Sequence, residues 1–281
     1  MSAHKQGTPS VPPGQLAELS QLAEKLWGLQ IGEKKRAVVE GRLSKLLQAT
    51  QTEDLPDLLR WLRSGKDAKR NLSAFDVLST NHTHFFREAN HYNWLGRDVL
   101  ANIQPNSAAR PRLRIWSAGC SNGCEPHTIA MVLADHFPKL SAVDARILAT
   151  DLAISQLRQA RQGRYSTKHL EGVAPEVRAR HFDAVDADDG LIWQVKPRLR
   201  GLVRFGLLNL LDAWPMRGPF DAIFCRNVMI YFDDPTRRAL VERFKALLRP
   251  GGLLFLGTSE GVAGKFDDLR SLESSAYQRV R

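Results

Sequence analysis

Apolar residues recur at intervals of three and four along the first part of the chain. They form three groups: Leu16, Leu19, Leu22 and Leu26, then Val39, Leu43, Leu46 and Leu47, then Leu55, Leu58, Leu59 and Leu62. Positions three and four apart share one side of an α-helix, so each group marks a helix with one buried face. The third helix has Thr52 or Glu53 near its start. The pattern predicts an all-helical N-terminal domain over residues 15–78, preceded by a loose, polar tail over residues 1–14.

The pattern changes beyond about residue 110, where short apolar runs alternate with helical stretches. The runs are Leu113–Trp116, Arg146–Ala149, Phe220–Cys225 and Leu253–Leu256. The helical stretches between them are Pro126–His136, Ile154–Gln162 and Pro235–Leu248. Alternation of strands and helices predicts an α/β domain, with a mostly parallel sheet covered by helices on both faces.

One stretch, from Tyr165 to Phe205, interrupts this alternation. It holds a short helix over Pro175–His181 and strand-like runs at Leu191–Val195 and Leu202–Phe205. It is too long for an ordinary connection in such a fold. We therefore predict a small inserted subdomain over about residues 166–205, within a second domain that spans residues 79–281.

Composition limits the class of protein. An apolar fraction of 43% with 25% charged residues is that of a globular protein rather than a disordered one. No apolar run approaches the roughly 18 residues that cross a bilayer, and the N-terminal residues lack the apolar region of a secretory signal. The expectation is a cytoplasmic protein without direct membrane insertion. Three cysteines, Cys120, Cys124 and Cys225, make neither a disulfide framework nor a metal site, so we expect no metal.

The formal net charge of +10 favours an acidic partner, which could be a nucleic acid, an anionic membrane face or an acidic protein surface. Five basic residues belong to the second predicted helix: Lys34, Lys35, Arg36, Arg42 and Lys45. They form either a solvated helix face or a docking face for an acidic helix. Both interpretations remain open from the sequence.

The segment Trp116–Pro126 follows an apolar run and precedes a helix, and it contains Gly119 and Gly123. Glycines let a ligand approach backbone amides closely at a helix N-terminus. A phosphate loop is excluded because the Gly-Lys-Ser/Thr ending is absent. Glu125 would repel a phosphate but suits a cationic group, such as the ammonium of an amino acid.

Asp151 stands at the end of the second predicted strand. An acidic residue at this position accepts hydrogen bonds from ribose hydroxyls in nucleoside-binding folds, or else caps the next helix. Together with the glycine loop, it favours a nucleoside ligand.

Three further motifs make the prediction specific. They are Thr80–Glu88 (TNHTHFFRE), Leu208–Leu210 (LNL) and Gly218–Phe232 (GPFDAIFCRNVMIYF). With the Ser117-Ala118-Gly119-Cys120-Ser121 loop, they resemble the chemotaxis receptor glutamate O-methyltransferase family of CheR type. The resemblance covers essentially all of residues 15–281.

The resemblance implies a class I, Rossmann-like methyltransferase domain with a small inserted antiparallel β-subdomain and an all-α N-terminal domain. It implies transfer of a methyl group from S-adenosylmethionine to receptor glutamate carboxylates, which gives glutamyl methyl esters and S-adenosylhomocysteine. Arg87 and Tyr231 match the residues at the reacting centre. The cofactor-binding residues that it implies, together with Gly119 of the glycine loop, are Asn81, Thr83, Arg87, Gly119, Glu125, Asp151, Asn209, Leu210, Arg226 and Asn227.

The implied partner is the cytoplasmic helical region of methyl-accepting chemotaxis receptors, with the basic N-terminal helix facing it. In some members of the family the β-subdomain binds a peptide at the receptor C-terminus. The sequence departs from the family's usual loop at Asn122 and Cys124, where threonine and glutamate are usual, and at His127, which replaces tyrosine. Glu125 keeps the second glutamate and is taken as the ligand.

A glutamate substrate is ionised near neutral pH, with an ordinary pKa of about 4.3, so the reaction needs no general base. We expect Arg87 to hold the carboxylate of the cofactor and Tyr231 to orient the substrate. His82, His84, His127 and His181 have no triad or metal partners and are interpreted as structural or surface residues.

Two other functions are weighed against this one. A nucleic-acid methyltransferase would fit the positive charge, but Arg226-Asn227-Val228-Met229 stands where base methylation uses an Asn/Asp-Pro-Pro-aromatic motif. A non-catalytic adaptor that binds the cofactor and receptors is disfavoured by the intact Arg87, Asn227 and Tyr231.

Overall fold

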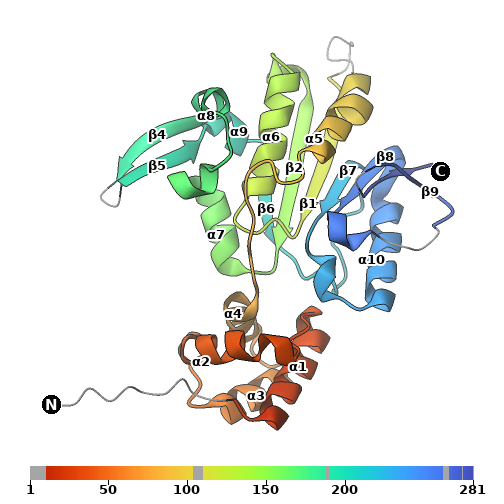
Figure 1. Cartoon of the computed structure of the whole chain (residues 1–281). Coiled ribbons are helices and arrows are strands. Elements are labelled where there is room, and N and C mark those ends of the chain that lie inside the picture. The colour runs from red at the N-terminus through yellow and green to blue at the C-terminus, as the bar shows by residue number, and fades with distance from the viewer. Residues whose placement is uncertain (1–10, 104–109, 188–189, 262–265, 274, 281) are drawn as a thin grey trace. The chain divides into compact units, whose positions relative to one another are not determined.

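The computed structural model describes residues 11–103, 110–187, 190–261, 266–273 and 275–280. The chain divides into two compact units (Figure 1). The first consists of the chain up to Thr80 together with Leu152–Ile154 and Tyr231–Asp233. The second contains the rest of the chain.

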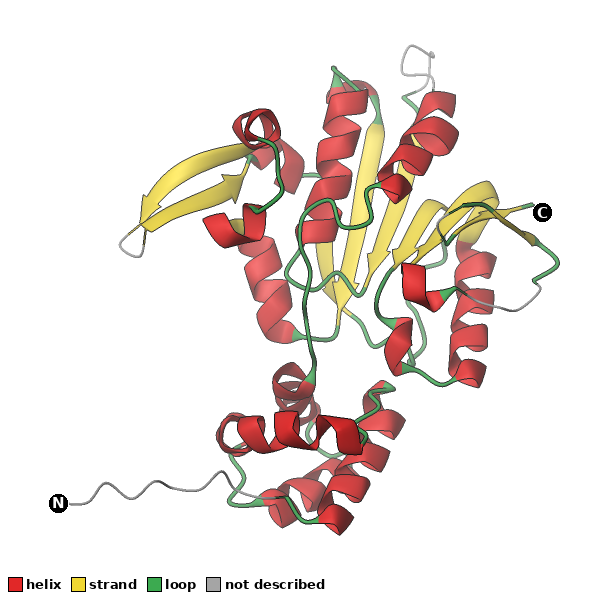
Figure 2. Cartoon of the chain, viewed as in Figure 1, coloured by secondary structure: helices red, strands yellow, loops and turns green. Residues whose placement is uncertain are grey.

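The first unit is helical in its described part, as the periodicity predicts (Figure 2). Its longer helices are α1 (Pro13–Trp27), α2 (Arg36–Thr50), α3 (Leu55–Ser64) and α4 (Ala68–Leu78), with a 3-10 turn at Glu33–Lys35. The Asp54 carboxylate caps α3 by accepting from Asp57 N at 2.7 Å, and the Asp67 carboxylate caps α4 by accepting from Arg70 N at 3.0 Å. Across the described ranges of the chain, no helix has both the length and the apolarity to cross a bilayer.

The prediction of a loose tail over residues 1–14 is wrong at its end. Val11 is only 1% exposed in the helical core, and its N–H donates to Glu40 Oε1 at 2.9 Å. Pro13 and Gly14 already belong to α1. A single buried valine carries no periodicity, so the pattern could not place it. Residues 1–10 lie outside the described residues.

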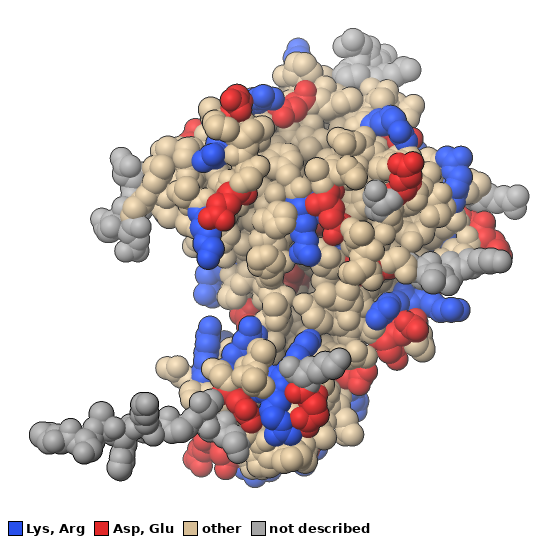
Figure 3. All heavy atoms as spheres, viewed as in Figure 1, with Lys and Arg blue, Asp and Glu red and all other residues tan. Residues whose placement is uncertain are grey.

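The basic residues of the second predicted helix are largely used within the first unit. Arg42 Nη1 donates to the carbonyls of Val77, Leu78 and Ser79, at 2.9, 3.1 and 2.9 Å, and so closes the C-terminal end of α4. Arg36 pairs with Glu33 at 2.8 Å, and Lys35 Nζ donates to Gln30 O at 2.9 Å. On the face drawn in Figure 3, acidic and basic side chains intermingle. Three of the five basic residues thus have partners within this unit, and a docking face for an acidic helix stays a prediction.

The second unit contains a seven-stranded sheet in the order β6-β2-β1-β7-β8-β10-β9. The strands from β6 to β8 run parallel, whereas β10 is antiparallel to both β8 and β9. Their bounds are β1 (Arg112–Ala118), β2 (Asp144–Asp151), β6 (Val203–Leu207), β7 (Phe220–Cys225), β8 (Leu248–Leu256), β9 (Leu269–Ser271) and β10 (Ala276–Arg279). This confirms the prediction of a mostly parallel sheet.

Both faces of this sheet are buried. Leu113 and Ile115 of β1 face a core shared with α5 (Asn90–Trp94) and α6 (Cys124–His136). Successive strand residues point to opposite faces, so Trp116 faces the other way. There its ring lies 5.2 Å from that of Phe244 on α10 (Asp234–Leu247). The near-continuous apolar runs of β1 and β7 follow from this burial on two sides.

The smaller sheet is antiparallel, in the order β3-β5-β4. Its strands are β3 (Arg164–Ser166), β4 (Phe182–Ala187) and β5 (Gly190–Val195), accompanied by α7 (Ile154–Gln162), α8 (Pro175–His181) and α9 (Pro197–Arg200). The predicted insertion over residues 166–205 is wrong at its end, because Val203–Leu207 is β6 and pairs in parallel with β2. Apolar periodicity identifies a strand, but it does not say which sheet the strand joins.

Candidate functional site

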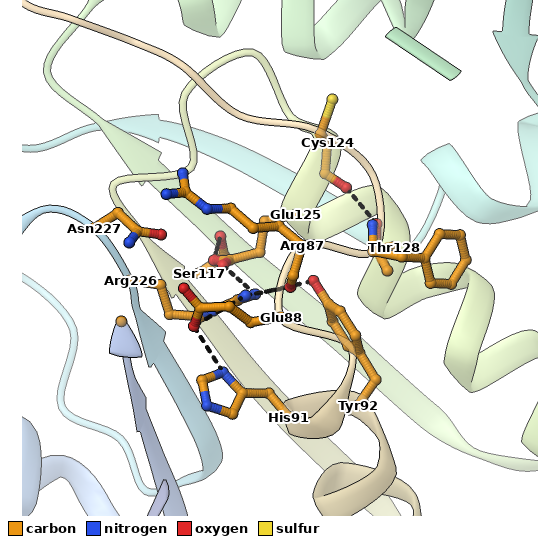
Figure 4. A network of polar contacts seen from close by, with 12 residues as sticks. Arg87, Glu88, His91, Tyr92, Ser117, Cys124, Glu125, Thr128, Arg226 and Asn227 are labelled. Atoms are coloured by element: carbon orange, nitrogen blue, oxygen red, sulfur yellow. Dashed lines mark hydrogen bonds and ion pairs between the residues drawn. The ribbon is translucent and has the colours of Figure 1, made fainter. Parts of the chain in front are cut away.

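Arg226, the residue after β7, is the centre of a buried polar network (Figure 4). Its side chain is 2% exposed. Nη1 donates to Tyr92 Oη at 3.1 Å and to Glu125 Oε2 at 3.2 Å. Nη2 lies 3.4 Å from Glu88 Oε2 and also donates to the backbone carbonyl of Arg87. Burial works against the guanidinium charge, but Glu125, Tyr92 and Glu88 outweigh it and raise the pKa of Arg226.

Glu125 lies in the first turn of α6 and is fixed from two sides. Besides the bond from Arg226, its Oε1 accepts from Ser117 Oγ at 2.7 Å. Burial raises the pKa of Glu125, and Arg226 and Ser117 oppose that rise. In formal charge, two carboxylates, Glu88 and Glu125, share one guanidinium, so this cluster suits a cationic ligand group.

The backbone around Arg87 is strained. Phe86 and Glu88 have φ values of 56° and 53°, and each left-handed residue that is not glycine costs about 1–2 kcal/mol. Two hydrogen bonds stabilise this strained conformation, one from Phe86 N to Thr128 Oγ1 at 3.2 Å and one from Arg226 to the Arg87 carbonyl. Arg87 Nη1 donates to His82 O at 3.0 Å. Strain of this kind is concentrated at functional sites.

The loop between β1 and α6 alternates through the left-handed region at Gly119, Ser121 and Gly123, with φ values of 78°, 49° and 91°. A Cβ atom at Gly119 would lie 2.3 Å from Val228 Cγ2, and one at Gly123 would lie 2.8 Å from the Cβ of Ala160. Both glycines are therefore required by packing within the protein as well as by backbone conformation.

Asp151, at the end of β2, joins three of the predicted segments. Its Oδ2 accepts from Ser121 N at 2.7 Å, and Ser121 Oγ in turn donates to Asn81 O at 3.2 Å. The Asp151 carbonyl accepts from Leu208 N at 3.0 Å, next to Asn209 and Leu210. The carboxyl ends of β1, β2 and β6 thus bring Asn81, Asp151 and the Leu208–Leu210 segment together.

The backbone N–H of Asn227 is bound by the carboxylate of Glu260, a residue that the sequence did not point to. Glu260 is 2% exposed and accepts from Asn227 N at 2.6 Å, Gly257 N at 2.7 Å and Ile230 N at 3.0 Å. Burial raises the pKa of Glu260, and these amide donors counteract the rise. The available signal is a glutamate three residues after Gly257, the glycine that follows the apolar run Leu253–Leu256.

Two further predicted residues are Thr83 and Tyr231. Thr83 lies between Asn81 and Arg87 and forms no side-chain hydrogen bond within the described part of the chain. Tyr231 belongs to the first unit, where its hydroxyl donates to Thr80 O at 3.3 Å. Lys35 Nζ lies 4.9 Å from the centre of the Tyr231 ring.

The buried histidines have structural partners. His127 Nε2 lies 3.1 Å from Ala160 O, and His181 Nε2 lies 3.1 Å from an Asp135 carboxylate oxygen. No group of three or more His, Cys, Asp or Glu residues suited to a metal ion occurs among the residues that the structure covers.

His127 should make stability depend on pH, because burial lowers its pKa from 6.5 to about 4. It stays neutral in the folded protein, so its contribution is present above about pH 6.5 and is lost as the pH falls toward about 4. Over that window the native protein should lose up to about 3 kcal/mol more unfolding free energy than His127→Gln, which does not ionise. Urea unfolding at several pH values measures the difference, and parallel pH profiles would refute it.

The glycine loop after β1, the acid at the end of β2 and the adjoining β6 loop define the class: a Rossmann-like α/β domain that binds a nucleoside cofactor at the carboxyl edge of its sheet. Residues 81–278 match the family described as CheR methyltransferase, SAM binding domain, and residues 14–75 match CheR methyltransferase, all-alpha domain. The chain therefore belongs to the CheR methyltransferase family and is an S-adenosylmethionine-dependent methyltransferase.

Named relatives are similar to this chain over nearly its whole length. The chemotaxis protein methyltransferase of Borreliella burgdorferi is 34% identical over 274 residues, which cover 96% of this chain and 95% of the relative. Chemotaxis protein methyltransferase 1 of Pseudomonas aeruginosa is 36% identical over 257 residues, covering 90% and 92%. Among solved structures, PKMT2 from Rickettsia typhi in complex with AdoHcy superimposes only partially, with a TM-score of 0.36, 17% identity and coverage of 63% of this chain and 26% of that one.

Proposed function

We propose that this protein transfers the methyl group of S-adenosylmethionine to glutamate side chains of chemotaxis receptors, giving glutamyl methyl esters. The observation that carries the proposal is the Arg226 network, which ties the family's signature motifs together around one charged cluster. The names of the relatives, chemotaxis protein methyltransferases, support a receptor substrate.

The residues fit the two charged groups of the cofactor's amino-acid part, its ammonium and its carboxylate. The excess negative charge of Glu88 and Glu125 suits its ammonium, and the Arg87 guanidinium suits its carboxylate through a bidentate pair. Arg226 acts here by fixing Glu125 and the Arg87 backbone, since its own side chain is buried. Asp151 is assigned to the ribose hydroxyls.

The remaining assignments follow the motif positions. Asn209 and Leu210 adjoin Asp151 and are assigned to the base of the cofactor. Four further residues complete the proposed cofactor site: Asn81, Thr83, Gly119 and Asn227.

S-adenosylmethionine, when bound, supplies an electrophilic methyl group on its sulfonium sulfur. The glutamate carboxylate is already anionic, so the protein's task is to align it with the methyl group and to exclude water. Alignment alone can lower a barrier by roughly 7–11 kcal/mol in favourable cases. A tight Arg87–substrate pair would stabilise the reactant more than the transition state, because the carboxylate loses its charge as the ester forms. We therefore assign Tyr231, not Arg87, to orienting the substrate.

The partner is assigned to the cytoplasmic helical region of the receptors, and the protein to the cytoplasm. Residues 15–78 would serve receptor recognition, and residues 79–281 methyl transfer. Binding of a receptor C-terminal peptide is proposed for the small sheet, whose edge strand β4 pairs on one side only with β5.

The proposal is tested by incubating the protein with methyl-labelled cofactor and cytoplasmic receptor fragments, with RNA and DNA as parallel substrates. Label should enter the receptor fragment and be released by mild alkali, as expected of a carboxyl ester. Label in nucleic acid instead would favour a nucleic-acid methyltransferase. Binding of S-adenosylhomocysteine without transfer to any receptor would favour a non-catalytic adaptor.

A further inference from the structure

The backbone carbonyl of Leu210 accepts hydrogen bonds from two side chains, one on α10 and one further along its own loop. Arg243 Nη1, on α10, donates to Leu210 O at 2.7 Å, and Trp214 Nε1 donates to the same oxygen at 3.1 Å. Arg243 Nη2 also donates to the carbonyl of Asp212 at 2.5 Å. One guanidinium and one indole therefore fix two carbonyls of the Asn209–Asp212 turn.

Arg243 and Trp214, here called the clamp, are connected by contacts to the centre of the sheet. The Arg243 guanidinium carbon lies 3.8 Å from the centre of the Trp214 ring, which is a close cation–π contact. The Trp214 ring lies 4.9 Å from that of Trp116 on β1, and Trp116 Nε1 donates to Thr150 Oγ1 at 2.9 Å. Thr150 immediately precedes Asp151, so the clamp and the proposed ribose carboxylate share one support.

The turn is also fixed from within. Asn209 Oδ1 accepts from Leu211 N at 3.1 Å, and Asn209 O accepts from Asp212 N at 3.2 Å. The Leu210 N–H, in contrast, donates to no acceptor in the described ranges. The Leu210 residue as a whole is only 7% exposed. A backbone N–H that is shielded from water and has no partner is costly unless a ligand satisfies it.

Strand order indicates which part of the cofactor would meet this N–H. Glu125 and Arg226 follow β1 and β7, Asp151 ends β2, and the Leu208–Leu210 segment follows β6. With the amino-acid group at the first pair and the ribose at Asp151, the base falls at the end of β6. An adenine ring offers N1 as an acceptor, whereas hypoxanthine carries a hydrogen on N1.

We infer that Arg243 and Trp214 are positioning residues that present the Leu210 N–H to adenine N1 and thereby set the selectivity for an adenine base. The inference rests on the proposed cofactor site and deepens it. The role of Arg243 is indirect: it sets the orientation of the peptide groups of the turn and need not touch the ligand.

Calorimetric titration with S-adenosylhomocysteine and S-inosylhomocysteine tests this. Arg243→Met keeps an unbranched chain over Trp214 but removes both hydrogen bonds. It should weaken S-adenosylhomocysteine binding about tenfold, the effect of losing roughly one charge-assisted hydrogen bond, and should reduce the preference for adenine over hypoxanthine. Hydrogen exchange at the amides of residues 208–212 should be faster in the ligand-free variant. Arg238→Met, an exposed residue on the same helix, should change neither.

Trp214→Phe, which removes only the Nε1 bond, provides a second and milder variant and should lose affinity in the same direction. Unchanged affinity in Arg243→Met, or an equal loss for both ligands, would overturn the inference and leave the proposed function standing. Failure of the unmodified protein to bind S-adenosylhomocysteine would overturn the proposed cofactor site itself.

Discussion

Replacing Arg226 by methionine is expected to destabilise the protein by about 3–5 kcal/mol and to remove measurable binding of S-adenosylhomocysteine. The substitution leaves the partly buried carboxylates of Glu125 and Glu88 without their shared counter-charge, and it releases the carbonyl of Arg87. Removing one partner of a buried ion pair costs more than the pair contributes, because an uncompensated charge remains. Denaturant unfolding and calorimetric titration measure the two effects.

A matched control is Arg249→Met. Arg249 Nε pairs with Asp221 Oδ1 at 2.6 Å near the amino end of β7, but the arginine side chain is 35% exposed. Arg249→Met should lower the free energy of unfolding much less than Arg226→Met does, and it should leave the affinity for the cofactor unchanged. Adding Glu88→Gln to Arg226→Met should recover part of the stability, because one of the stranded charges is removed. An Arg226→Met protein with native stability and native affinity would contradict the role given to this network.

Replacing Arg87 by lysine is expected to weaken S-adenosylhomocysteine binding by about tenfold to a hundredfold. Lysine keeps the positive charge but loses the planar fork that pairs with a carboxylate in two places. It also loses the bond from Arg87 Nη1 to His82 O. The loss corresponds to about 1.5–3 kcal/mol, the range for hydrogen bonds to charged groups. Calorimetric titration and single-turnover kinetics at saturating cofactor separate binding from chemistry.

Tyr231→Phe is the contrasting variant. It removes a hydroxyl assigned to the substrate, so turnover should fall while affinity for the cofactor stays native. A large loss of cofactor affinity in Tyr231→Phe would place this residue in the cofactor site instead. If Arg87→Lys bound the cofactor normally and failed only with the receptor, the assignment of Arg87 would be wrong.

The elements that the sequence predicts well are those with strong local signals. Phe220–Cys225, Ile154–Gln162 and Pro175–His181 were predicted with the bounds that the structure has, because apolar runs, capping residues and prolines define them locally. The short strand β9 at the edge of the sheet and the short strand β10 beside it lack such signals, and the sequence does not predict them. The run beginning at Leu202 was predicted as a strand but given to the wrong sheet, since pairing with β2 is a long-range choice.

The site shows the same limit. Motifs supplied Arg87, Glu125 and Arg226, but not the partners that fix them. Glu260 acts across 33 residues on Asn227, and Arg243 acts across 33 residues on Leu210. Such contacts depend on how strands and helices meet in space, which local periodicity does not encode. Phe86 and Glu88 likewise have positive φ because tertiary contacts stabilise that conformation. Neither residue is a glycine, so the sequence does not indicate a positive φ there.

The most direct test is peptide mass spectrometry of a cytoplasmic receptor fragment after incubation with the protein and S-adenosylmethionine. We predict the mass increment of one methyl group on glutamate residues, absent when those glutamates are changed to glutamine and absent with Arg226→Met. Methyl groups on any other residue type, or none on a fragment that binds the protein in the presence of cofactor, would contradict the account.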